Sequence, residues 1–143
     1  MNEVNDLIKK IGNTIVNSIP DDFDWVMARY NIKILITYSQ SGGTAIDKNG
    51  NELSLSPNFK PIHPNFSWQL REAIYNHDPG KGAWYEMDMN ITRDGKFDIK
   101  FDYDQKPGFN IPLEDLDYIK DHQKFPRTEE VTPIWLKEIL DKK

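Results

Sequence analysis

Residues Trp84 to Asp104 read WYEMDMNITRDGKFDIKFDYD and contain two runs in which apolar and polar residues alternate strictly. Strict alternation is typical of strands that bury one face and expose the other. Arg93-Asp94-Gly95 separates the runs and supplies the glycine that many tight hairpin loops need. This stretch therefore predicts an antiparallel β-hairpin, around which the rest of the chain can be arranged.

The parity of the two runs determines the length of the hairpin loop. Residues directly opposite each other in an antiparallel pair point to the same face, so a two-residue Asp94-Gly95 loop would mix apolar with polar side chains. A three-residue loop, with Gly95 in the left-handed position of a type I turn plus bulge, keeps the faces separate. The predicted inner-face pairs are Ile91 with Phe97, Met89 with Ile99 and Met87 with Phe101. We expect a core face made of Tyr85, Met87, Met89, Ile91, Phe97, Ile99 and Phe101.

The same register predicts an outer face with an excess of acidic side chains. Its pairs are Asp88 with Lys100, Glu86 with Asp102, and Trp84 with Asp104. Like charges facing each other, as in the Glu86 and Asp102 pair, destabilise a sheet by up to about 1 kcal/mol. A lysine on a neighbouring strand or solvent can offset this repulsion, and so can a basic binding partner; the pattern leaves these alternatives open.

Length and composition indicate an ordinary globular protein. We expect residues 1–143 to form a single domain, because 143 residues with 38% hydrophobic content suffice for one core. The absence of cysteine excludes disulfides, thiolate ligands and cysteine nucleophiles. The start MNEVNDLIKK has no signal-peptide pattern, and no apolar run approaches the roughly 20 residues of a membrane helix. A cytoplasmic protein without membrane contact is expected.

The net charge of −5 is concentrated in one segment. Ten acidic and five basic side chains lie between residues 84 and 121, which accounts for the whole net charge of the chain. An acidic segment repels phosphate backbones and attracts basic proteins. We therefore expect no nucleic-acid binding and a partner that is itself basic.

Periodicity and turn residues predict four helices, two before the central hairpin and two after it. Apolar residues recur at helical spacing from residue 4 to residue 19, which predicts an amphipathic N-terminal helix that covers the sheet and ends at Pro20. A short helix is expected over residues 66–77. Two more are expected after the hairpin, one beginning at Pro112 and one capped by Thr132-Pro133. The first of these should turn Leu113, Leu116 and Ile119 inward.

The β-forming residues outside the central hairpin predict further antiparallel strands. Residues 25–40 favour one long bent strand, or two short ones meeting near Asn31, ended by a turn at Ser41-Gly42-Gly43. Asn49-Gly50 predicts a two-residue hairpin loop. That loop would pair Ile46 with Leu53 and Thr44 with Leu55, before an irregular connection from Ser56 to Pro64. The predicted fold class is α+β, with an antiparallel meander of hairpins covered by an N-terminal helix and short C-terminal helices.

No residue pattern predicts catalysis, and we expect no catalytic residue, cofactor or metal. The three histidines lack the spacing of zinc ligands, and no serine stands in a GxSxG context. Glu86, Asp102 and Asp104, on the polar face of the hairpin, could together hold a divalent cation. A metal-dependent hydrolase is therefore the less favoured alternative to a protein that acts only by binding.

Three segments of the chain resemble the YezG-like family of bacterial immunity proteins. They are Trp84 to Asp104 followed by Pro107, the passage from Ile19-Pro20 through Trp25 to the strand ending near Tyr38, and the tail FPRTEEVTPIWLKEIL. The run DGKFDIKFDYD is the most specific part, whereas residues 40–81 match poorly. The resemblance implies an α+β fold with an antiparallel sheet and an antitoxin function against a secreted toxin, often a nuclease.

The resemblance and the charge distribution lead to the same expected function. Nuclease toxin domains tend to be basic, so an immunity protein with an acidic surface could bind the C-terminal domain of its cognate toxin by charge complementarity. The candidate partner-binding residues are Glu86, Asp88, Asp102, Asp104, Glu114, Asp115 and Asp117. For the last three, a favourable interaction with the dipole of the helix that they begin is the preferred explanation. A regulatory or adaptor protein with an acidic docking face is the alternative function.

Overall fold

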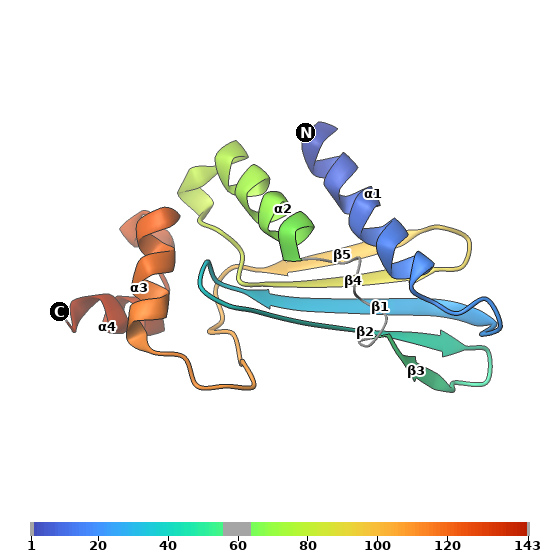
Figure 1. The fold of residues 1–143 in the computed structure, drawn as a ribbon. Coiled ribbons are helices and arrows are strands. Elements are labelled where there is room, and N and C mark those ends of the chain that lie inside the picture. The colour runs from blue at the N-terminus through green and yellow to red at the C-terminus, as the bar shows by residue number, and fades with distance from the viewer. Residues whose placement is uncertain (1, 56–63, 143) are drawn as a thin grey trace.

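The computed structural model describes residues 2–55 and 64–142. Its elements are α1 (Asn2–Asn17), β1 (Trp25–Ile34), β2 (Ser39–Asp47), β3 (Glu52–Ser54), α2 (Pro64–His77), β4 (Glu86–Thr92), β5 (Phe97–Asp102), α3 (Asp115–Lys124) and α4 (Ile134–Asp141). The strands form an antiparallel sheet in the order β3-β2-β1-β4-β5. Helices α1 and α2 cover one face, and α3 and α4 pack at one end (Figure 1). The α+β prediction is confirmed, while the connection predicted from Ser56 to Pro64 lies mostly outside the described residues.

The central hairpin has the predicted register. All three inner pairs form, and the outer pairs Glu86–Asp102 and Asp88–Lys100 form with them. Gly95 closes the three-residue loop with a φ of 88°. The four predicted core residues at or before Ile91 are buried, but Phe97 is 40% exposed. The core prediction is wrong at Phe97 because β5 is an edge strand, and no other described strand lies beside it.

The start of β4 departs from the predicted alternation. Trp84, expected on the outer face opposite Asp104, is fully buried and packs against Phe101 with ring centroids 5.3 Å apart. Tyr85 is also buried, but in a second cluster with the C-terminal helices. Trp84 and Tyr85 can both be buried, although they are adjacent in sequence, because strand β4 begins only at Glu86. Trp84 belongs to the main core, and Tyr85 belongs to the second cluster.

The turns around β1 and β2 lie elsewhere than predicted. The chain reverses at residues 35–38, where Leu35 N–H donates to Tyr38 C=O at 2.8 Å, and β2 then runs straight through Gly42-Gly43. The irregularity in β1 lies between Trp25 and Met27 and not near Asn31. Ile36 consequently falls in the turn and is 40% exposed.

The second hairpin forms with a register one residue different from the prediction. Ala45 pairs with Leu53, and Ile46 pairs with Glu52. The loop has three residues and ends at Gly50, whose φ is 84°. The Asp47 carboxylate accepts the N–H groups of Asn49 and Asn51, both at 2.9 Å, and so stabilises the longer loop.

The N-terminal helix matches its prediction, whereas the C-terminal helices start later than expected. The buried side chains of α1 include Val4, Leu7, Ile11 and Ile15. Helix α3 begins at Asp115, with Glu114 and Asp117 forming a capping box, and Leu116 is 52% exposed. Helix α4 has Pro133 as its N-cap, because the Thr132 hydroxyl donates back to Thr128 C=O at 2.8 Å.

Replacing Gly95 with alanine is expected to lower the free energy of unfolding by about 1 kcal/mol. No atom lies within 4 Å of the position that a Cβ would occupy, so the cost comes only from the positive φ. The matched control is Gly108→Ala, which also meets no atom within 4 Å and has no positive φ. Urea denaturation of both variants tests this, and equal stabilities of the two variants would contradict it.

Candidate partner-binding face

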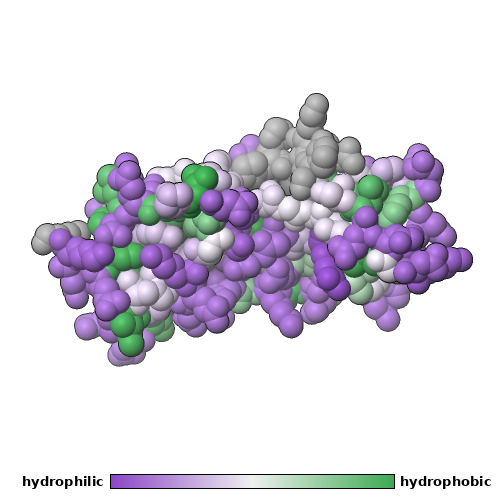
Figure 2. All heavy atoms as spheres, turned by 90° about the horizontal axis from the view of Figure 1, so that it is seen from below, coloured by the Kyte–Doolittle hydropathy of each residue, from purple (hydrophilic) through white to green (hydrophobic). Residues whose placement is uncertain are grey.

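The face of the sheet opposite α1 and α2 carries the polar side chains of four adjacent strands. We call it the outer face. Reading across β2, β1, β4 and β5, its three rows are Gln40–Lys33–Glu86–Asp102, Gly42–Asn31–Asp88–Lys100 and Thr44–Arg29–Asn90–Asp98. Alternation along each strand sends these side chains away from the core. Figure 2 shows this face from below, and it is hydrophilic over most of its area.

Asn31 fixes two of the predicted acidic residues on this face. Its Nδ2 donates to Glu86 Oε2 and to Asp88 Oδ1, each at 2.7 Å. An amide that bridges two carboxylates holds both charges in fixed positions and stabilises them by charge-assisted hydrogen bonds. Strand β1 also supplies Lys33, which pairs with Glu86 on the side opposite Asp102. Strand β1 thus places a lysine in the same row as the like-charged pair, although no ion pair joins Lys33 to Glu86.

A groove of about 700 Å³ opens on the outer face. Gly42 and Gly43 form part of its lining, and the missing side chain at Gly42 leaves space beside Asn31 in the same row. Asn110, from the loop after β5, also lines the groove and donates its N–H to Gln40 Oε1 at 2.6 Å. The remaining lining includes charged and amide side chains: Arg29, Asp88, Asn90 and Lys100. The two glycines that suggested a turn thus form part of a recess.

Beneath the groove, Tyr30 points into the core and links β1 to α2. Burial raises the pKa of its phenol, and hydrogen bonding with Ser67 and Ser41 opposes this shift. The tyrosine therefore stays neutral at physiological pH and adds no charge to the groove.

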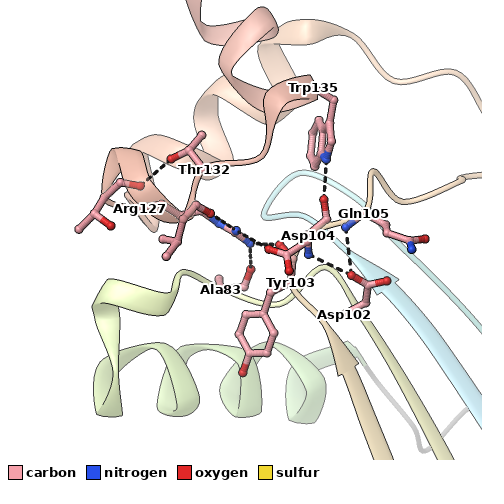
Figure 3. A network of polar contacts seen from close by, with 10 residues as sticks. Ala83, Asp102, Tyr103, Asp104, Gln105, Arg127, Thr132 and Trp135 are labelled. Atoms are coloured by element: carbon pink, nitrogen blue, oxygen red, sulfur yellow. Dashed lines mark hydrogen bonds and ion pairs between the residues drawn. The ribbon is translucent and has the colours of Figure 1, made fainter.

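The two remaining hairpin acids serve mainly structural roles. Asp102 Oδ1 accepts the N–H groups of Asp104 and Gln105, at 2.9 and 3.0 Å, and so shapes the turn after β5. Asp104 lies away from the outer face, next to the C-terminal helices (Figure 3). Its carboxylate lies 3.6 Å from Arg127 Nη1, and its carbonyl accepts the indole N–H of Trp135 at 2.6 Å.

The three acids at the start of α3 form a separate group. Asp117 accepts the Thr37 hydroxyl at 2.8 Å and the Glu114 N–H at 2.9 Å, and Asp115 lies 3.2 Å from Lys142 Nζ. Helix α3 begins on the lower side of the molecule in Figure 1, which is the side of the outer face. The seven predicted residues therefore divide into the outer-face acids, the α3 acids, and Asp104 apart from both.

Sequence reasoning missed the contribution of β1 to this face. Arg29, Asn31 and Lys33 alternate with the buried Tyr30, Ile32 and Ile34, so their direction could have been read from the same parity argument. The pairing of β1 with β4, which brings Asn31 to the two acids, is a non-local contact that no local pattern specifies.

Two properties of the described residues bear on other functions. Over residues 2–55 and 64–142, no three histidine, aspartate or glutamate side chains are grouped so that they could hold a metal ion. Glu86, Asp102 and Asp104 therefore do not converge on one point. Among the described helices, none is both long and apolar enough to cross a membrane.

A scan of the chain against protein-family models finds no match, and a search of curated proteins finds no relative either.

Proposed function

We propose that this protein is an immunity protein that binds the C-terminal domain of a cognate bacterial toxin, a basic and nuclease-like domain, and neutralises it in the cytoplasm. The observation that carries the proposal is the pair of carboxylates on Glu86 and Asp88, which one amide holds beside an open groove. The acidic character of residues 84–121 and the resemblance of the central hairpin to immunity proteins support the same function.

The proposed contact uses the β4–β5 half of the outer face. Bases are fewer there, because Arg29 and Lys33 stand on β1 while β4 and β5 supply four acids and Lys100 to the three rows. An arginine or lysine of the toxin would contact the carboxylates of Glu86 and Asp88, which the Asn31 amide already holds in place, so that their ordering costs little on binding. The α3 acids would add long-range attraction and speed the encounter.

The direct test is binding of the toxin domain encoded next to this gene. The purified toxin domain should be retained by this protein in a pull-down, and co-expression should protect cells from the toxin. If the neighbouring gene encodes no toxin domain, or if its domain neither binds nor is neutralised, the proposal is wrong.

Reversing Glu86 and Asp88 to lysine is expected to slow association with the toxin domain at least tenfold at low ionic strength. The change removes both fixed negative charges from the contact and replaces them with repulsive ones. Stopped-flow or surface-bound kinetics at two salt concentrations measure the rate.

The matched control for this pair is Glu3→Lys with Asp6→Lys. Both residues are exposed on α1, in the helical layer on the other face of the sheet, and the change in net charge is the same. An equal loss of association rate in the two double variants would show that net charge, and not the outer face, governs binding. Circular dichroism confirms that each variant is folded.

A further inference from the structure

The free edge of β5 exposes backbone N–H and C=O groups that pair with no described strand. Thr92 N–H donates to Lys96 C=O, which identifies residues 92 and 96 as a hydrogen-bonded pair of the ladder. Because such pairs alternate, the N–H and C=O groups of Phe97, Ile99 and Phe101 point away from β4. The other edge strand of the sheet is β3, which has only three residues.

The sequence of this edge strand is complementary to itself when two copies of it pair antiparallel. Residues 96–102 read KFDIKFD, and a two-fold axis at Ile99 places each lysine opposite an aspartate. The pairs are Lys96 with Asp102, Asp98 with Lys100, Phe97 with Phe101, and Ile99 with itself. The backbone hydrogen bonds also fit this pairing. Phe97, Ile99 and Phe101 carry the free N–H and C=O groups, and the pairing sets these residues opposite one another.

Charge selects this register over its neighbours. A shift of the axis to Asp98 would set Lys96 opposite Lys100 and Asp98 opposite itself. A shift to Lys100 would set Asp98 opposite Asp102 and Lys100 opposite itself. Like charges directly opposite each other are unfavourable, and charged edge strands usually prevent pairing for this reason. Of these three registers, the one centred on Ile99 is the one that sets every lysine of residues 96–102 opposite an aspartate.

We propose that a second copy of this chain docks on β5, pairing the two strands antiparallel about Ile99. The two five-stranded sheets would then form one continuous sheet, with both helical layers on one side and both outer faces on the other. The exposed ring of Phe97 would be covered by the partner's Phe101, which extends the core across the junction. This inference is independent of the toxin partner, because it rests on the edge strand β5 alone.

The test uses three charge variants in sedimentation velocity experiments at low ionic strength. The wild-type protein should be a dimer at micromolar concentration. Asp98→Lys alone sets lysine opposite lysine twice, and Lys100→Asp alone sets aspartate opposite aspartate twice, so each should raise the dimer dissociation constant at least tenfold. The double variant Asp98→Lys/Lys100→Asp restores every pair and should return the dimer to near its wild-type affinity.

An equimolar mixture of the two single variants provides a second, independent readout. At positions 98 and 100 the Asp98→Lys copy carries two positive charges and the Lys100→Asp copy carries two negative ones, so both cross-strand contacts of the mixed dimer are attractive. The mixture should therefore form dimers that neither variant forms alone. A monomeric wild type overturns the proposal, and so does a dimer unaffected by the single changes or not recovered in the double variant and the mixture. Circular dichroism and thermal melting verify the fold of each variant.

Discussion

Replacing Asp121 with alanine is expected to lower the free energy of unfolding by about 3–5 kcal/mol, because it leaves a charged guanidinium buried without its counter-ion. Arg71 and Asp121 form a two-pronged pair, with Nη1–Oδ1 and Nη2–Oδ2 both at 2.7 Å. Their side chains are only 2% and 3% exposed. Arg71 Nε also donates to Trp84 C=O at 2.6 Å, and Asp121 accepts Ile36 N–H at 2.9 Å. The pair thus joins α2, α3, the turn after β1 and the start of β4.

The adjacent pair of Glu72 and Lys124 is the matched control. It connects the same two helices, but its Nζ–Oε2 distance is 3.8 Å and both side chains are about half exposed. Solvent screens such a pair, so Lys124→Ala should change the free energy of unfolding by less than about 1 kcal/mol. Urea denaturation of both variants provides the comparison. A loss of less than about 1 kcal/mol for Asp121→Ala would mean that the buried pair contributes no more than the exposed one.

Replacing Arg127 with methionine is expected to cost about 3 kcal/mol. The Arg127 side chain is 1% exposed and donates to three main-chain carbonyls, those of Ala83, Tyr103 and Val131 (Figure 3). Methionine keeps much of the volume but leaves these carbonyls without their donor, and buried unsatisfied groups cost roughly 1–3 kcal/mol each. Because Gly82 packs directly against the stem of Arg127, little room remains for water to replace the lost donors.

The control for Arg127→Met is Arg93→Met. Arg93 also donates to a carbonyl, that of Trp25 at 2.9 Å, but its side chain is 57% exposed, so water can replace the lost donor. We expect a loss within about 1 kcal/mol for Arg93→Met. Guanidinium denaturation followed by tryptophan fluorescence measures both. Equal losses would show that burial of the carbonyls does not decide the cost.

The Arg127 variant also reports on the charge environment of Tyr85. Burial raises the pKa of Tyr85 to about 12, and the positive charge of Arg127 opposes that rise. The guanidinium carbon of Arg127 lies 5.0 Å from the centroid of the Tyr85 ring, and that of Arg71 lies 5.6 Å from it. One buried aromatic ring therefore contacts both of the buried arginines that hold the C-terminal helices to the sheet.

Much of the fold was predictable because the decisive patterns are local. The alternation on both sides of Gly95 determined the register of the central hairpin, and the helical periodicity before Pro20 determined the buried stripe of α1. The prediction was wrong where a local signal competed with another contact. The turn at residues 35–38 contains neither glycine nor proline, and the Asp47 carboxylate lengthens a loop that Asn49-Gly50 alone would make shorter.

The side-chain contacts between residues far apart in the sequence were less accessible to prediction. Arg71 and Asp121 are far apart in the sequence and stand in amphipathic helices, where charged residues normally face solvent. Asn31 carries no signal of its own, and its role follows only from the pairing of β1 with β4. Of the predicted partner-binding residues, Glu86 and Asp88 lie together on the outer face, while Asp104 lies next to Arg127 and the C-terminal helices. Their role in binding remains a prediction.

The hydrogen-bond donors Arg127 and Trp135, which hold the C-terminal helices, determine which positions of the sequence can change in evolution. Arg127 and Trp135 donate to the carbonyls of residues 83, 103, 104 and 131, and every amino acid supplies a carbonyl. The accepting positions can therefore change side chain without losing the bond, whereas the two donors cannot be exchanged for residues that lack N–H groups. Relatives of this chain should retain the arginine and the tryptophan in a tail whose contact partners have diverged.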